Sequence, residues 1–95
     1  MQENEIHRIS KIFRALGNEV RVKILLLVSE TRKPLHIKGV AKALNMDYAA
    51  LYRHVKVLQS SGLVEIFEVG RSRVLSLKNR EMVEQLIEIA NKMMY

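Results

Sequence analysis

Apolar residues recur every three or four positions near the start of the chain, at the spacing of an amphipathic helix. This pattern predicts a helix over about residues 3–16 that ends at Gly17. The apolar positions are Ile6, Ile9, Ile12, Phe13 and Leu16. Asn18 is a favourable N-cap for a second helix, over about residues 19–29. Because this second stretch has few polar positions on any side, we expect it to be the central core helix.

Pro34 interrupts the helical pattern, and residues 35–37 that follow are expected to form a short extended piece. A weaker helix comes next, with its apolar positions at Val40, Ala41 and Leu44. Gly39 lowers the helix propensity of this segment.

The clearest pattern lies in residues 45–64, where Asp47 is a good N-cap and Gly62 a good C-terminal stop. Together they predict a helix over about residues 48–60. At about 100° per residue the helix has two distinct faces. The apolar stripe is formed by Leu51, Val55 and Leu58, and the opposite side by Ala49, Tyr52, Arg53 and Lys56.

Two β-prone stretches, residues 63–69 and 73–77, flank Gly70-Arg71-Ser72 and predict a hairpin. Asn79 then caps a last helix, over about residues 80–94. The predicted order is helix, helix, short strand, helix, helix, two-stranded hairpin, helix. This order indicates a single, mainly α domain over residues 1–95, a winged helix-turn-helix fold with a small β-hairpin wing.

Positive charge is concentrated in the middle of the chain, within a net charge of +6. Residues 31–64 contain six lysines and arginines against Asp47 alone, and residues 70–80 contain four against no acid. Acidic residues gather instead near the two ends. The distribution favours double-stranded DNA as a polyanionic partner of the middle segment.

In a winged helix-turn-helix the second helix of the motif enters the major groove, and the hairpin reaches the adjacent backbone or minor groove. Ala49 and Ala50 would allow close approach to base edges. Arg53 could contact guanine or equally a phosphate, and Lys56 is expected on a phosphate. Tyr48 and Tyr52 are either DNA contacts or half-exposed surface aromatics.

Further phosphate contacts are expected outside this helix. The candidates at the wing are Arg71 and Arg73, and those flanking the motif are Arg32, Lys33 and Lys38. The alternative for the two wing arginines is simple protection of a hairpin edge. His54 falls nearer the apolar stripe than the exposed face, so we expect it to be packed and hydrogen-bonded.

The chain lacks the residues that other functional classes need. No Gly-rich phosphate loop, matched nucleophile and base, or paired carboxylates can be recognised, so no enzymatic activity is predicted. With no cysteine and three scattered histidines, neither a metal nor another cofactor is expected. The apolar runs are too short for a membrane span and the N-terminus is polar, which favours a soluble cytoplasmic protein.

The last helix carries more apolar surface than one small domain needs. We expect it to form a homodimer seam together with the first helix, although an intramolecular core is the simpler alternative. The candidate interface residues are Ile6, Ile9, Phe13, Val83, Leu86, Ile87, Ala90, Met93 and Met94.

Three stretches also carry a family resemblance: Ala15 to Leu25, Leu51 to Val64, and Gly70 in the hairpin. They resemble the ArsR/SmtB-like winged-helix repressors, over about residues 12–78. The resemblance implies a homodimer built from the first and last helices that binds a near-palindromic operator. The family's recognition-helix contacts would fall on Tyr48, Ala49, Ala50, Tyr52 and Arg53, and its wing contacts on Arg71 and Arg73.

The chain departs from the metal-sensing members of this family. Their cysteine pair corresponds to Ala41 and Ala43 here, and the last helix has no histidine. Metal sensing at the usual sites is therefore not expected, and the residues indicate no other effector ligand. We expect a sequence-specific repressor, with a nonspecific architectural DNA-binding protein or a winged-helix protein-interaction module as alternatives.

Overall fold

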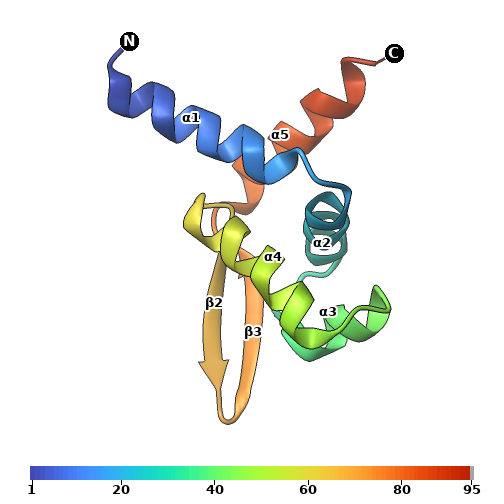
Figure 1. Ribbon diagram of the computed structural model, residues 1–95. Helices are drawn as coiled ribbons and strands as arrows, with labels where there is room; N and C mark the ends of the chain where they lie inside the picture. Colours follow the sequence, from blue (N-terminus) through green and yellow to red (C-terminus); the bar gives the residue numbers. More distant parts are fainter. Residues whose placement is uncertain (95) are drawn as a thin grey trace.

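The computed structural model describes residues 1–94, and its elements follow the predicted order (Figure 1). They are α1 (Glu3–Leu16), α2 (Glu19–Glu30), β1 (Leu35–His36), α3 (Ile37–Ala43), α4 (Tyr48–Ser60), β2 (Val64–Val69), β3 (Ser72–Leu77) and α5 (Arg80–Lys92). In Figure 1, α1 and α5 lie at one end of the molecule and the β2–β3 hairpin points away at the other. This confirms a mainly helical winged helix-turn-helix fold.

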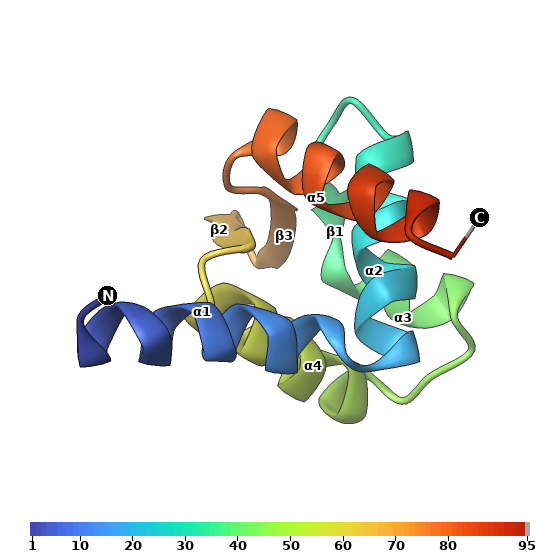
Figure 2. The same ribbon diagram turned by 90° about the horizontal axis from the view of Figure 1, so that it is seen from above.

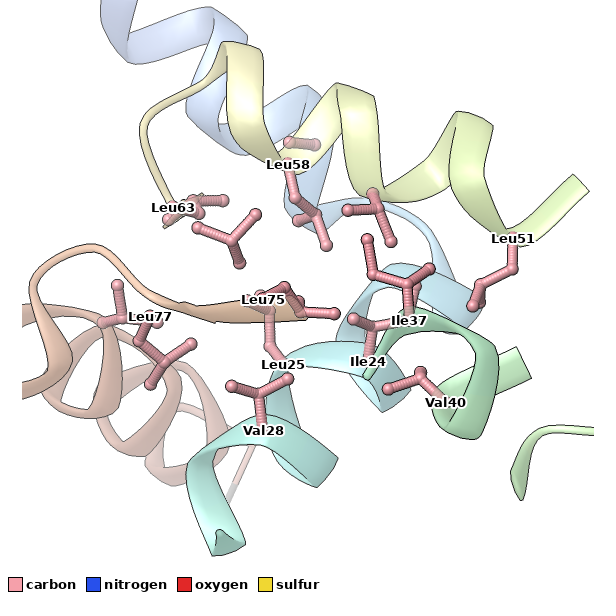
Figure 3. Close-up of a cluster of buried hydrophobic side chains, with 14 of the residues drawn as sticks. Ile24, Leu25, Val28, Ile37, Val40, Leu51, Leu58, Leu63, Leu75 and Leu77 are labelled. Carbon is pink, nitrogen blue, oxygen red and sulfur yellow. The ribbon is translucent and has the colours of Figure 1, made fainter. Parts of the chain in front are cut away.

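The core forms around α2, as its lack of a polar face predicted. Ile24, Leu25 and Val28 of this helix are completely buried. Figure 3 shows their side chains meeting residues of α3, α4 and β3, including Ile37, Leu51 and Leu75. Burial of these aliphatic groups is the main favourable term for folding a domain of this size. It also holds the apolar side of α4 inward.

Side-chain caps begin three of the helices where they were predicted. The Asn18 side chain accepts from the Arg21 backbone N–H at 3.2 Å, and the Asn79 side chain from that of Met82 at 3.2 Å. The Asp47 carboxylate accepts from the Ala50 backbone N–H at 3.4 Å. Each cap satisfies an amide that has no partner inside its helix.

Gly62 ends α4 in the left-handed conformation, with φ of +83°. Its backbone N–H donates to the Gln59 carbonyl, and the N–H of Leu63 donates to the Leu58 carbonyl. These two bonds form a Schellman motif, which turns the chain directly into the wing. Gly17 differs, because its φ is −81°; α1 ends there as predicted, but without a left-handed glycine.

The wing belongs to a three-stranded antiparallel sheet with the strand order β1-β3-β2. Val69 pairs with Ser72, so the hairpin turn contains Gly70 and Arg71 only, one residue fewer than predicted. Gly70 has φ of +62° at the first turn position, a conformation that favours glycine. Other bounds also differ: Ile37 starts α3 instead of ending an extended piece, and α5 ends at Lys92, before Met93 and Met94. One limit each of α2, β2 and β3 differs by a single residue.

Arg80 anchors α5 to the C-terminal end of α2. Its guanidinium donates to the carbonyls of Val28, Ser29 and Thr31 at 3.3, 2.9 and 2.8 Å, and it pairs with Glu84 at 3.3 Å. The Ser29 hydroxyl donates to the Glu84 carboxylate. This hydrogen bond, followed by the positive charges of Arg80 and Arg32, lowers the pKa of Glu84. The contacts fix the direction in which α5 leaves the core.

Candidate nucleic-acid interface

The two faces predicted for α4 are present in the structure. Leu51, Val55 and Leu58 are fully buried, which orients the helix against the core. The opposite side leaves three side chains exposed, namely Ala49, Arg53 and Lys56. Lys56 Nζ lies 2.7 Å from the Gln59 side-chain oxygen and stays on the helix surface. Three other residues of the predicted reading face, Tyr48, Ala50 and Tyr52, are half-buried, and the two tyrosines pack against the core.

The tyrosines of α4 are connected to the wing. Tyr48 and Tyr52 are half-buried and stack with ring centroids 5.9 Å apart and planes at 9°. The Arg73 guanidinium of β3 lies over the Tyr52 ring, 4.8 Å from its centroid. Interaction with the Tyr48 hydroxyl, and then with Tyr52, raises the pKa of Arg73 above its ordinary value. This cation–π stack, which sequence reasoning missed, joins α4 to the hairpin.

A basic hollow of about 400 Å³ lies between the first turn of α4 and the wing. It is lined by His36, Lys38, Tyr48, Glu68, Gly70, Arg71, Ser72 and Arg73. Three cationic side chains face Glu68 alone, so the hollow has a net positive charge. Lys38 and Arg71, predicted from different parts of the sequence, are thus brought together beside α4.

Arg32 and Lys33 are not part of this surface. They lie in the loop between α2 and β1, which Figure 2 places beside α5, on the opposite side of the molecule from α4. The charge of residues 31–64 suggested a single basic face. The fold instead places the beginning of this segment, in the α2–β1 loop, away from α4. Of the three predicted flanking residues, Lys38 lines the hollow beside α4.

His54 is half-buried and hydrogen-bonded, as its angular position predicted. Its Nδ1 lies 3.1 Å from a terminal nitrogen of Arg21. Partial burial, and then the charges of Arg21 and Arg53, lower its pKa below 6.5. Both effects favour the uncharged imidazole.

A second exposed surface, on α1 and α5, is apolar. Ile6, Ile9 and Phe13 are 44%, 41% and 62% exposed, and Met93 and Met94 are 79% and 87% exposed. Leu86 and Ile87 are half-buried, and Ala90 is exposed. Val83, predicted at the interface, is instead 4% exposed, because the first turn of α5 packs into the core.

Three exposed apolar residues of this surface were missed by sequence reasoning: Leu26, Met82 and Ile89. Leu26 lies on α2, which has apolar residues on every side, and the core covers only some of them. This excess of apolar residues in the sequence could have indicated a further exposed apolar position. Between α2 and α5 it borders a hollow of about 780 Å³, together with Leu16, Val22, Leu86, Ile87 and Met94. The apolar surface thus extends from α5 onto α2.

The sequence model of the family described as bacterial regulatory proteins of the ArsR family matches residues 18–65. This stretch runs from the N-cap of α2 to the beginning of the wing. A helix-turn-helix-type transcriptional regulator of Methanocaldococcus jannaschii is 35% identical, over 84% of this chain and 93% of the relative. The chain belongs to the ArsR family.

Two further proteins extend the comparison. The cadmium resistance regulatory protein CadC homolog of Staphylococcus aureus is 30% identical, over 86% of this chain and 66% of that protein. The homodimeric winged helix-turn-helix domain of a possible ArsR-family regulator from Mycobacterium bovis superposes with a TM-score of 0.83, at 18% identity. The superposition covers 99% of this chain and 91% of that one. This ArsR-family chain is therefore a DNA-binding transcriptional regulator and not an enzyme.

Two structural features of this regulator bear on other classes of function. Within residues 1–94, no three histidine, aspartate or glutamate side chains are grouped as a metal site would require. None of the helices described is both long enough and apolar enough to span a membrane.

Proposed function

We propose that this ArsR-family regulator is a homodimeric repressor that recognises a near-palindromic operator. Each α4 would lie in the major groove and each wing on the adjacent backbone or minor groove. The observation that carries the proposal is the exposed Ala49, Arg53 and Lys56 face of α4, which adjoins the basic hollow at the wing. Repression would follow from blocking access of polymerase to the same DNA.

Different roles are assigned to the side chains of this face. Arg53 is proposed to read guanine in the major groove, and Ala49 allows the helix backbone to approach the base edges. Lys56, Lys38 and Arg71 are proposed phosphate contacts. The half-buried Tyr48 and Tyr52, with Ala50, are proposed to contact the groove through their exposed parts, while their stacking shapes the surface beside it.

The apolar surface of α1 and α5 supports the dimer. A monomer would leave Phe13, Met93 and Met94 more than half exposed, an arrangement typical of an uncovered interface. Ile6, Ile9, Leu86, Ile87 and Ala90 are proposed to complete the seam, together with Leu26. Two-fold symmetry would then present two copies of α4 to two half-sites about one helical turn apart.

Selection from a pool of random duplexes, followed by salt titration on the winning sequence, tests the proposal. We expect a two-fold symmetric consensus. Three phosphate contacts from each protomer predict a slope of log K against log salt of about −5. Binding of all duplexes alike would instead favour a nonspecific architectural protein. Failure to bind any duplex at low salt would favour a protein-interaction module.

Substitution of Arg53 tests its assigned role. We expect Arg53→Ala to weaken operator binding by about tenfold or more, because a bidentate contact to guanine is lost. Binding to random duplex should change far less. Equal losses on both duplexes would identify Arg53 as a phosphate contact.

A further inference from the structure

The side chain of Arg21, in the first turn of α2, bonds to the last turn of α1. Its Nε donates to the Ala15 carbonyl at 2.6 Å, and a terminal nitrogen donates to the Arg14 carbonyl at 3.1 Å. Carbonyls in the last turn of a helix lack the full set of partners that the helix interior provides. A guanidinium here supplies both donors and the positive charge that a helix C-terminus favours.

The other terminal nitrogen of Arg21 reaches α4. It lies 3.1 Å from Nδ1 of His54, the residue that follows Arg53. A guanidinium can only donate, so Nδ1 accepts and the imidazole proton resides on Nε2. The lowered pKa of His54 agrees with this neutral form. One side chain thus connects the end of α1 with the middle of the recognition helix.

We infer that Arg21 is a positioning residue that sets the orientation of α4 relative to α1. The inference rests on the proposed function, which assigns α1 to the dimer seam and α4 to the DNA. If the dimer holds α1, the angle between α1 and α4 determines the separation of the two recognition helices. A planar guanidinium bonded to three acceptors fixes that angle more firmly than a single bond could. Arg21 and His54 therefore determine which half-site spacing is accepted, without contacting DNA.

Substitutions at His54 separate positioning from general stability. His54→Leu keeps a side chain of similar bulk but removes the acceptor, whereas His54→Asn keeps an acceptor at the position of Nδ1. The probes are the selected operator and copies in which one or two base pairs are added or removed between the half-sites. Random duplex serves as the measure of nonspecific binding.

We expect the wild type and His54→Asn to prefer the selected spacing. His54→Leu should bind the selected operator about tenfold more weakly, because a charge-assisted bond that holds α4 is lost. It should lose little affinity for the altered spacings, so that the spacing preference flattens. Binding to random duplex and the dimer dissociation constant, measured by sedimentation, should stay unchanged.

Arg21→Lys provides a second variant, which keeps the charge near α1 but lacks the planar fork, and should flatten the preference in the same way. Urea unfolding establishes which variants are folded. A folded variant of either kind that keeps the wild-type spacing preference, or loses affinity equally at every spacing, overturns the positioning role. A wild type that prefers no sequence overturns the proposed function instead, and the inference with it.

Discussion

Arg71 and Arg73 lie two positions apart on the wing but have different surroundings. Both are exposed, but Arg71 lies in the hairpin turn, whereas the guanidinium of Arg73 lies over the Tyr52 ring. Arg71 precedes β3, whereas Arg73 lies within this strand and contacts α4. Through this contact with Tyr52, Arg73 holds the wing against α4.

The salt dependence of operator binding distinguishes these two arginines. We expect Arg71→Gln to reduce the slope of log K against log salt by about 1 for each wing that loses its phosphate contact. Arg73→Gln should weaken operator binding while changing the slope less, because its charge is directed at an aromatic ring. Equal changes in slope would show that both are phosphate contacts.

The titration of His54 tests its bond with Arg21 directly. Because its pKa is lowered in the folded protein, the unfolded chain binds the proton more readily, and stability should fall as pH decreases below 6.5. NMR titration should show His54 titrating below 6.5, with the neutral ring protonated on Nε2. Arg21→Met should move the pKa back upwards, since it removes an adjacent positive charge. An unchanged pKa in that variant would contradict the assigned contact.

At the scale of elements, the ends of the helices decide how the reading surface is built. α4 begins at the Asp47 cap and ends at the Gly62 turn, and β2 starts two residues later. This short connection fixes the orientation of the wing relative to α4 before any DNA is bound. The two faces of α4 follow from its periodicity, but their direction follows from burial of Leu51, Val55 and Leu58.

Glycine substitutions measure how much the α4 terminus contributes. Gly62→Ala should lower the free energy of unfolding by about 1 kcal/mol, because a side chain disfavours the left-handed conformation. An added Cβ meets no atom within 4 Å at Gly62, so the loss is conformational and not steric. Urea unfolding provides the measurement.

Gly39 is the matched control, because it lies within α3 and an added Cβ there also meets no atom within 4 Å. Gly39→Ala should raise the free energy of unfolding by about 0.5–1 kcal/mol. A loss of stability from both substitutions would contradict this explanation. It would show that a Cβ at these positions clashes with its surroundings, and that the conformation of Gly62 is not the cause.

At the scale of the whole molecule, apolar and basic surfaces lie at different ends. Figure 1 shows α1 and α5 at one end and the wing at the other. The exposed apolar residues of α1 and α5 are numerous, while Arg71 and Lys38 lie beside the wing. This separation allows a dimer to form without covering the surface proposed to bind DNA.

A charge at the apolar surface tests the dimer. Phe13→Glu should produce a folded monomer, because the 62% exposed ring contributes little to the core but would be covered in the seam. Operator affinity should fall steeply, since one protomer would contact only one half-site. Sedimentation and circular dichroism measure assembly and folding.

Phe67→Glu is the control, since Phe67 is 47% exposed but lies on β2 of the wing. It should leave the oligomeric state unchanged. Wild-type assembly by Phe13→Glu would place the dimer seam elsewhere.

The sequence by itself determined the elements and the faces of α4. These features are local, so they could be recognised without knowing which distant residues pack against them. They are helix periodicity, the caps at Asn18, Asp47 and Asn79, and the stop at Gly62. The family followed from the same motifs. Such features depend on residues only a few positions apart, where geometry is nearly fixed.

Only the tertiary structure decided which distant residues meet. It placed Arg73 over Tyr52, Arg21 against His54, and Val83 in the core, and it separated Arg32 and Lys33 from α4. These relations depend on how the helices pack around α2, and periodicity within one element carries no information about the packing angle between two. Charge counted along the chain therefore could not show that the loop with Arg32 and Lys33 lies away from α4. The contacts that connect α4 to the wing and to α2 likewise appeared only in three dimensions.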